Sequence, residues 1–198
     1  AKVETVGEIL FTTTHLESYI PGDDGSTARE MQIIEAKSFC QKKIDNSDLK
    51  GAIISGDLNW DDERKRSTGT DNTLLTVMNG RNLSAAGSGE KVTEWADAWL
   101  DTRPGQDGYT YDSKENPMLK GNLRRRFDRC LMYVPHDANR LAIHSTNLIG
   151  TEAIGGLEWR KEVQQWRGGQ PTGATSYQIR PVAPSDHFGL VATIGDIS

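Results

Sequence analysis

Short apolar runs of strand length alternate along the chain with longer polar segments, and this alternation predicts a layered α/β fold. Runs rich in β-branched and aromatic residues favour strands because their side chains pack well on a pleated surface. Several of these runs end beside polar side chains, so the sequence predicts a functional site assembled at strand ends. The segments expected to form strands are 9–14, 52–55, 127–134, 141–143 and 188–194.

A helix is expected to begin at Thr27, because Thr27 and Glu30 form a capping-box pattern. Residues 95–100 predict a second, short helix, and 109–111 a strand or an extended loop. The Gly- and Gln-rich segment 158–175 is expected to be a long surface loop. Apolar residues recur at helical spacing along one side of the first helix as far as its expected end: Ile33, Ala36, Cys40 and Ile44.

The composition is that of one well-cored domain, with 198 residues, 26% charged residues and a formal net charge of -5. This acidic balance argues against a protein that coats polyanions in general. It permits an enzyme that grips a few phosphates through a small basic patch. The runs 124–126 and 64–66 are the candidates for such a patch, although either run is equally typical of a solvated surface.

The sequence predicts an intracellular protein. It has no run of about 20 apolar residues that could cross a bilayer and no start resembling a secretory signal. Its two cysteines, Cys40 and Cys130, are too few for a disulfide framework and lie among apolar residues. We therefore expect both thiols to be buried and reduced.

Asp57 and Asn59 follow directly after an apolar run that is expected to be a buried strand. If extended geometry continues past the strand, both side chains point to the same face. A carboxylate there can accept a proton from an attacking water, and an amide can donate to an anionic oxygen. The alternative is an Asx turn that merely closes the strand.

His187 follows Asp186 at the start of the last predicted strand, where it could contact a phosphate or donate a proton. Asp128 could hold such a histidine charged and oriented, or it could form an ordinary ion pair with Arg129. His15 ends the first predicted strand and could equally be a structural histidine. The sequence shows no zinc-ligand spacing, no phosphate-binding glycine loop and no nucleophile elbow.

Five short motifs spread over nearly the whole chain resemble, in their order and separation, those of the endonuclease/exonuclease/phosphatase superfamily. Within it, the closest likeness is to the tyrosyl-DNA phosphodiesterase 2 group. The resemblance implies a four-layer αββα sandwich of the DNase I-like type. The motifs are Thr14–Ser18, Gly56–Asn59, Tyr109–Asp112, Arg126–Arg129 and Ser185–Leu190.

The resemblance also implies an activity, the Mg²⁺-dependent hydrolysis of 5′-phosphotyrosyl-DNA linkages in the repair of topoisomerase–DNA adducts, in the nucleus or the cytoplasm. Mn²⁺ could replace Mg²⁺. Asp57 would position or deprotonate the attacking water, and Asn59 would orient it. His187 would contact the scissile phosphate, with Asp128 as its partner. Asp57 and Asp186 would belong to the metal region.

The same group grips single-stranded DNA near its 5′ end with a wall of side chains, and His15, Ser18, Tyr111 and Phe127 occupy the matching positions. Stacking of aromatic rings on bases tolerates any base sequence. Tyr111 stands where the group usually has Trp, but a tyrosine ring can still stack. Other substrates of the superfamily remain alternatives: abasic DNA, RNA tails, phosphoinositides and sphingomyelin.

The superfamily places an Asn that contacts the phosphate and the principal metal-ligating Glu before the strand that ends at His15. Only 14 residues precede His15 here. We therefore expect a C-terminal portion of a catalytic domain that lacks its N-terminal strands, with the principal Glu upstream of residue 1. Such a chain would have weak activity or none by itself. A non-catalytic fragment that binds nucleic acid or a partner is the remaining alternative.

Overall fold

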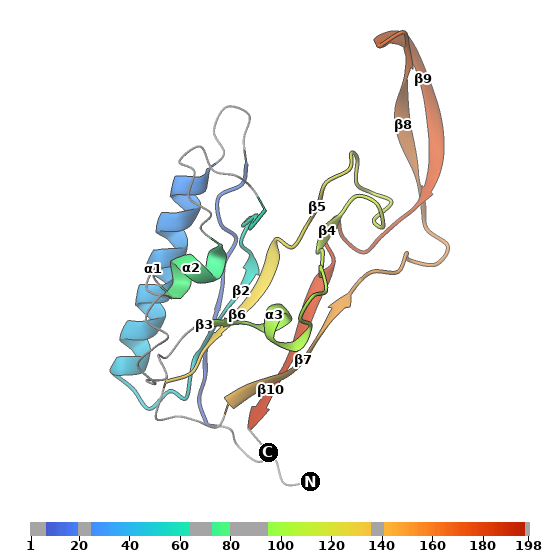
Figure 1. Cartoon of the computed structure of the whole chain (residues 1–198). Coiled ribbons are helices and arrows are strands. Elements are labelled where there is room, and N and C mark those ends of the chain that lie inside the picture. Colours follow the sequence, from blue (N-terminus) through green and yellow to red (C-terminus); the bar gives the residue numbers. More distant parts are fainter. Residues whose placement is uncertain (1–6, 20–24, 64–72, 80–94, 136–140, 197–198) are drawn as a thin grey trace. The chain divides into compact units, whose positions relative to one another are not determined.

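The computed structural model describes residues 7–19, 25–63, 73–79, 95–135 and 141–196 (Figure 1). The chain divides into two compact units. The first unit comprises Ala1–Gly108, Arg126–Asn147 and Leu190–Ser198, and the second comprises Tyr109–Arg125 and Leu148–Gly189. Among the described residues, no helix is both long enough and apolar enough to span a bilayer.

A four-stranded sheet forms the centre of the first unit, with the strand order β1-β2-β6-β3. β1 runs parallel to β2, and the other neighbouring pairs are antiparallel. The strands expected around 9–14, 52–55 and 127–134 are confirmed. The apolar side chains of β2 and β6 are buried in the core, whereas Phe11 of β1 is 64% exposed. The bounds are β1 (Leu10–Thr13), β2 (Ala52–Asp57), β3 (Trp95–Asp97) and β6 (Asp128–Tyr133).

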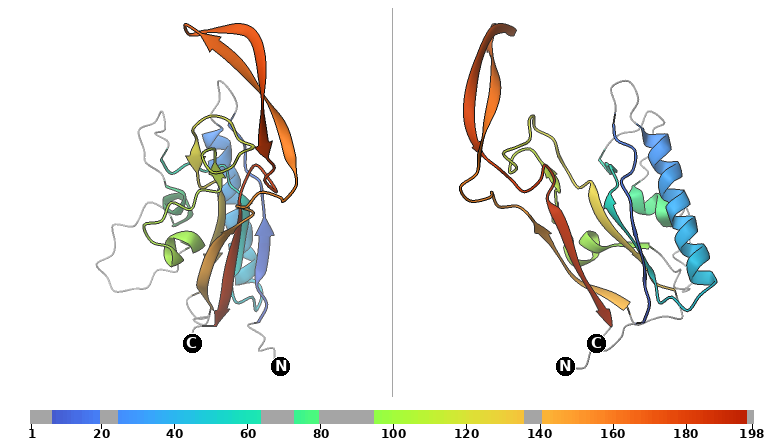
Figure 2. Two further views of the ribbon diagram at one scale, coloured as in Figure 1. Left: turned by 90° about the vertical axis from the view of Figure 1, so that its right-hand side faces the viewer. Right: turned by 180° about the vertical axis from the view of Figure 1, so that it is seen from behind.

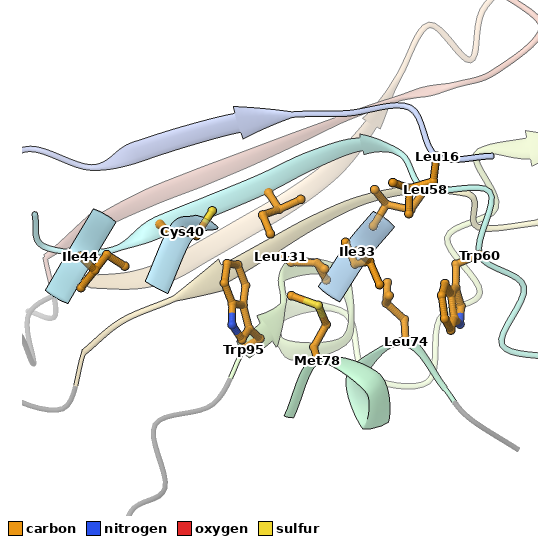
Figure 3. Packing of buried hydrophobic residues seen from close by; sticks show 12 residues of the cluster. Leu16, Ile33, Cys40, Ile44, Leu58, Trp60, Leu74, Met78, Trp95 and Leu131 are labelled. Atoms are coloured by element: carbon orange, nitrogen blue, oxygen red, sulfur yellow. The ribbon is translucent and has the colours of Figure 1, made fainter. Parts of the chain in front are cut away.

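Helix α1 (Ser26–Asp45) packs on one face of this sheet, together with the short helix α2 (Leu74–Asn79). Figure 3 shows the side chains between the helices and the strands. Burying one such aliphatic side chain contributes about 1.5–3 kcal/mol. The expected apolar face of α1 is confirmed. The core on this side includes Ile33, Cys40 and Ile44 from α1, Met78 from α2, and Ile54 and Leu131 from the sheet.

The expected capping box at the start of α1 is wrong. The residue that precedes the helix is Gly25, in the left-handed conformation with φ 62°, and no side chain caps the helix. Arg29 instead ties this end to the preceding loop, because its Nη1 donates to the carbonyl oxygen of Glu17 at 2.9 Å. Glycine pays no steric penalty at positive φ, which allows the chain to enter the helix there without a polar cap.

The opposite face of the four-stranded sheet packs against a second pair of strands, β7 (Leu141–Ile149) and β10 (Gly189–Asp196). Alternate residues of β2 and β6 supply this face, including Ile53 and Cys130. Burial and the nearby charge of Asp97 raise the pKa of the Cys130 thiol to about 11. Both cysteines are buried and free, as expected. The first unit therefore consists of helices, a sheet and a strand pair in successive layers.

The short helix expected over 95–100 is half wrong. Trp95–Asp97 forms β3, and only Ala98–Thr102 forms a helix, α3. The change occurs at Asp97, whose Oδ1 accepts hydrogen bonds from the backbone N–H groups of Trp99 at 3.0 Å and Leu100 at 3.4 Å. A side-chain acceptor at this position satisfies the first donors of a helix, so Asp97 both ends the strand and caps the helix.

Asp97 is also the centre of a buried charge network. Its carboxylate accepts hydrogen bonds from Arg126 Nη1 at 2.7 and 2.8 Å and from Arg129 Nη1 at 3.1 Å. Arg129 Nη2 also binds Asp62 Oδ2 at 2.7 Å. Burial by itself would raise the pKa of Asp97, but the two guanidinium groups outweigh it and hold that pKa below its usual value.

The run 124–126 was one of two candidates for a basic patch, and two of its three arginines are paired with acidic side chains. Arg126 is buried on Asp97, and Arg124 forms a 2.8 Å ion pair with Asp112 in the second unit. These arginines neutralise acidic side chains within the protein, and their positive charge is not offered to a ligand as one surface. The other candidate run, 64–66, lies outside the described residues.

The second unit contains two hairpins. The shorter one pairs β4 (Tyr111–Asp112) with β5 (Arg124–Arg125). The longer one pairs β8 (Glu158–Arg167) with β9 (Gln170–Pro181), and Figure 2 shows it from two sides as a twisted two-stranded ribbon. The surface loop expected over 158–175 is thus wrong. The polar composition of the segment hid its alternation, and the Gly168-Gly169 pair was the turn signal.

Gly56, near the end of β2, is expected to tolerate no side chain. Its φ is +136°, and an added Cβ would lie 2.0 Å from the carbonyl oxygen of Thr14. Gly56→Ala should lower the free energy of unfolding by about 1–3 kcal/mol from backbone strain, with the clash adding to this loss. Urea denaturation followed by circular dichroism measures the change. Gly155→Ala is the matched control, because its Cβ would meet no atom within 4 Å; equal losses in the two variants would contradict the prediction.

Candidate active site in the first unit and a histidine segment in the second

Backbone pairing continues beyond the end of β1 and brings the loop after it alongside the end of β2. The N–H of Thr14 donates to the carbonyl of Ser55 at 3.0 Å, and that of Leu16 to the carbonyl of Asp57 at 2.9 Å. The ladder places His15 Nε2 3.6 Å from Asp57 Oδ2. His15 is exposed, so this contact contributes little to stability and leaves the imidazole accessible.

Asp57 and Asn59 adopt the Asx-turn alternative. Asp57 Oδ1 accepts a hydrogen bond of 2.9 Å from the backbone N–H of Asn59. Asn59 has φ 47°, the only positive φ of a residue other than glycine among the described positions. Of the two alternatives, the extended one is therefore not adopted, since extended geometry ends at Asp57. The turn fixes the carboxylate through Oδ1, while Oδ2 faces His15.

The Asn59 side chain ties the ends of β1 and β2 together. Its Nδ2 donates to the carbonyl oxygen of Leu16 at 3.0 Å and lies 3.4 Å from Ser18 Oγ. The structure thereby gathers four of the predicted site residues: His15, Ser18, Asp57 and Asn59. Because both donor directions of the amide point into the loop after β1, the oxygen Oδ1 is the atom suited to orient a water molecule.

Asp128 is the cross-strand partner of Asp57 in the antiparallel pair of β2 and β6. Residues directly opposite in such a pair point to the same face of the sheet, and two like charges there are unfavourable. The expected alternative, an Asp128–Arg129 ion pair, is wrong, because Arg129 binds Asp62 and Asp97 instead.

Phe127 is only 8% exposed, so little of its ring is available for stacking on a base. Its carbonyl oxygen accepts a hydrogen bond of 2.9 Å from the backbone N–H of Leu58 and extends the pairing of β2 with β6. This contact holds the segment that carries Asp57 in place. A role for Phe127 in binding substrate stays a prediction.

His187 lies in the second unit, in a turn built by its neighbours. Its backbone N–H donates to Ser185 Oγ at 3.2 Å, and that hydroxyl donates to Asp186 Oδ1 at 3.2 Å. The imidazole meets the ring of Tyr111 edge-on, with 5.2 Å between the ring centres and an interplanar angle of 81°. Two predicted residues, His187 and Tyr111, are therefore neighbours, and Asp186 is exposed beside them.

Two buried polar residues position this histidine turn: Asn116, which the sequence did not single out, and Thr110, which lies in the Tyr109–Asp112 motif. Asn116 Nδ2 donates to the carbonyl oxygens of Ser185 at 2.8 Å and Asp186 at 3.2 Å. The carbonyl of Thr110 accepts the backbone N–H of Phe188 at 2.7 Å. A buried amide is retained when its hydrogen bonds are satisfied, so Asn116 acts as a positioning residue for the turn. Its only sequence signal is weak, an Asn that Pro117 keeps out of a helix.

Asp112 holds the segment that carries Tyr111. Both of its oxygens accept hydrogen bonds from Arg124, at 2.9 and 2.8 Å, and Oδ1 also accepts the backbone N–H of Lys114 at 3.0 Å. Burial would raise the pKa of Asp112, but these hydrogen bonds outweigh it and lower that pKa. The fork geometry fixes β4 against β5 and thereby the direction of the Tyr111 ring.

The described residues do not by themselves form a complete magnesium site. No group of three or more His, Cys, Asp or Glu side chains able to hold a metal occurs among them. Of the expected metal-region residues, Asp57 belongs to the first unit and Asp186 to the second. Mg²⁺ prefers six oxygen ligands in octahedral geometry, several of them water. The carboxylates Asp57 and Asp128 fit such a cation chemically, but the set needs further ligands.

Comparisons with known proteins support the fold. No family model and no curated protein matches the sequence. Solved structures do match, among them truncated Caenorhabditis elegans TDP2, C. elegans TDP2 and D. rerio TDP2 complexed with single strand DNA product. In that order, the TM-scores are 0.54, 0.56 and 0.53, and the sequence identities are 18%, 16% and 22%. The matches cover 96%, 96% and 93% of this chain and 54%, 42% and 55% of the other chain. The chain spans about half the length of these proteins. It has their fold, the mixed α/β fold of the DNase I-like endonuclease/exonuclease/phosphatase type.

Proposed function

We propose that this chain carries catalytic residues of a Mg²⁺-dependent phosphodiesterase that hydrolyses 5′-phosphotyrosyl-DNA linkages. The observation that carries the proposal is the arrangement at the ends of β1 and β2. There His15, Asp57 and Asn59 are joined by contacts of 2.9–3.6 Å, with Asp128 opposite Asp57 across the sheet. The motifs around these residues and the fold shared with TDP2 support the choice of substrate.

In the proposed reaction Asp57 positions the attacking water and accepts its proton. The carboxylate is oriented at Oδ1 by the backbone N–H of Asn59, and its Oδ2 lies 3.6 Å from His15 Nε2. Asn59 Oδ1 orients the same water. The water oxygen forms a new bond to phosphorus, the bond from phosphorus to the tyrosine oxygen breaks, and the phosphate stays on the DNA. For the second unit, we propose that His187 donates a hydrogen bond to a phosphate oxygen of the substrate.

A single DNA strand is the proposed partner. The candidate contacts are His15 and Ser18 in the first unit and Tyr111 in the second, each taken by itself. One of the solved structures with the same fold is a D. rerio TDP2 bound to single strand DNA product, which supports this choice. The rings of Tyr111 and His187 form a T-shaped pair, and we propose that Tyr111 is the aromatic residue on which a base stacks. Phe127 contributes less than the motif implies, because it is buried.

Mg²⁺, or Mn²⁺ in its place, would polarise the phosphate and neutralise developing charge when bound. Asp57 and Asp128 are the described carboxylates suited to the metal in the first unit, and Asp186 is the candidate in the second. Since these do not make a complete ligand set, we propose that this chain works together with a further segment that supplies the principal Glu. The expected activity of the 198-residue chain alone is correspondingly weak.

The test is release of tyrosine from a 5′-phosphotyrosyl oligonucleotide under single-turnover conditions, with and without Mg²⁺. We expect slow, Mg²⁺-dependent release that disappears in His187→Ala and persists in Lys42→Ala, an exposed control on α1. Parallel assays use abasic DNA, an RNA tail and phosphoinositide vesicles. If any of these is turned over faster than the 5′-phosphotyrosyl oligonucleotide, it is the better candidate substrate. A protein that binds the oligonucleotide and turns over none of them would support the non-catalytic alternative.

A further inference from the structure

A groove of about 430 Å³ lies within the second unit, beside the long hairpin. One wall is the turn region 113–121, and the other is formed by residues of β8 and β9. None of the residues expected to act in catalysis lines it. The side chains that decide its chemistry are Lys114, Lys120, Lys161, Glu162, Trp166 and Arg180.

Three of these cations are unbalanced. Within the part of the chain that the structure describes, Lys120, Lys161 and Arg180 form no ion pair with a carboxylate. Lys114 pairs with Glu115 at 3.8 Å, and Glu162 is the acidic residue in the lining. The groove is therefore positive within a chain whose formal net charge is -5.

The cations are close enough to repel one another. Burial lowers the pKa of Lys161, and the charges of Arg180 and Lys120 lower it further. Lys161 is fixed in the groove because its Nζ donates to the carbonyl oxygen of Leu119 at 3.0 Å. Arg180 is held by Gln178, whose Oε1 accepts from its Nη2 at 2.7 Å. Repulsion between these fixed positive charges destabilises the hairpin, and a bound polyanion would reduce that repulsion.

The hairpin register places two of these cations, Lys161 and Arg180, on one face. Trp159 pairs with Arg180, and Lys161 pairs with Gln178, so Lys161 and Arg180 are diagonal neighbours on the same side of the ribbon. On β8, Trp159, Lys161 and Val163 are half-buried, whereas the alternate residues are exposed. This face therefore packs toward the turn region, and its charges line the groove.

Trp166 adds a second kind of surface to the same groove, because its side chain is 63% exposed. An exposed indole beside cations provides a stacking platform for a base together with contacts for phosphates. A small phosphate-containing ligand would use the cations alone. The combination matches a single-stranded nucleic acid, whose charged backbone runs alongside unstacked bases.

We propose that this groove binds a single-stranded nucleic acid, with Lys120, Lys161 and Arg180 on successive phosphates and Trp166 stacked on a base. The choice of nucleic acid over another polyanion rests on Trp166 and, in addition, on the proposed function. The groove is a binding site separate from the catalytic residues, and it gives the hairpin β8–β9 a function.

The test is fluorescence anisotropy of a labelled single-stranded oligonucleotide with the whole chain, in EDTA so that no hydrolysis occurs. The double variant Lys120→Ala/Arg180→Ala should bind about tenfold more weakly at low salt and show a salt slope smaller by about 1.4, at ~0.7 per phosphate contact. The control Lys42→Ala/Lys43→Ala removes the same charge from the exposed end of α1. Equal loss of affinity in the two double variants would overturn the proposal.

Trp166→Ala tests the base platform separately. It should weaken binding by about 5- to 100-fold for a normal oligonucleotide and leave binding of an abasic strand of the same length unchanged. An equal effect on both strands, or competition by polyglutamate as strong as by the oligonucleotide, would overturn the assignment to nucleic acid. His187→Ala separates this proposal from the proposed function. This variant should abolish hydrolysis and keep binding of the oligonucleotide in the groove. If the proposed reaction fails, the binding measurements therefore still test the groove.

Discussion

Replacing Asp57 with asparagine is expected to lower the single-turnover rate of phosphodiester hydrolysis by about 10²–10⁴-fold, the usual contribution of a positioned general base. Asn can still accept the hydrogen bond that Asp57 Oδ1 receives from the backbone of residue 59, so the turn should persist. What the variant loses is the charged Oδ2 that faces His15. The measurement is tyrosine release in the presence of Mg²⁺.

Asp107→Asn is the matched control for this change, because Asp107 is an exposed carboxylate of the same unit. Urea denaturation should give the same free energy of unfolding for both variants within about 0.5 kcal/mol, as surface substitutions usually do. A rate for Asp57→Asn equal to that of the control would exclude Asp57 as the base. A rate loss accompanied by a large loss of stability would point to a structural role instead.

The largest effect on stability is expected from Asp97→Ala. The carboxylate is buried and binds Arg126 and Arg129 at 2.7–3.1 Å. Removing one partner of a buried ion pair leaves uncompensated charge and costs about 3–5 kcal/mol. Loss of the cap at the start of α3 adds about 1 kcal/mol. Urea denaturation followed by tryptophan fluorescence measures the change, with Asp107→Ala as the exposed control.

The pH dependence of this difference has a definite sign. Because the folded protein lowers the pKa of Asp97, its contribution to stability is present above the pKa of the unfolded state, about 3.9. It is lost as the pH falls through the lower folded value. The gap in free energy of unfolding between the wild type and Asp97→Ala should therefore be full near neutral pH and shrink below about pH 4. A constant gap would show that the carboxylate acts through its shape alone.

Much of the first unit could be predicted from the sequence, because its elements bury apolar side chains at regular spacing. The apolar run at Ala52–Ile54 and the helical spacing of Ile33, Cys40 and Ile44 each report a burial that the structure shows. The segment 158–175 gave no such signal. Its hairpin is mostly exposed and carries polar and charged side chains. Backbone hydrogen bonds form this hairpin, and no pattern of buried apolar residues marks it in the sequence.

The candidate site was predictable in its residues but not in its geometry. His15, Asp57 and Asn59 stand out because polar groups follow predicted strands. The positive φ of Asn59 depends on its hydrogen bonds to the loop after β1, and no local pattern encodes those contacts. Asn116 was missed for the same reason, since the carbonyls that it binds lie about 70 residues further along the chain.

The base of the long hairpin is closed by its own hydrogen bonds. The backbone of Ile154 donates to Val182 at 2.8 Å, and that of Val182 donates to Leu157 at 3.4 Å. The two ends of the hairpin segment therefore lie side by side where it joins the rest of the second unit. A segment whose two ends lie side by side can be lengthened, exchanged or deleted as one insertion. Such a change would leave unaltered the register of β2 and β6, the strands that carry Asp57 and Asp128. Affinity for one ligand and turnover of another can then be selected independently within a single polypeptide.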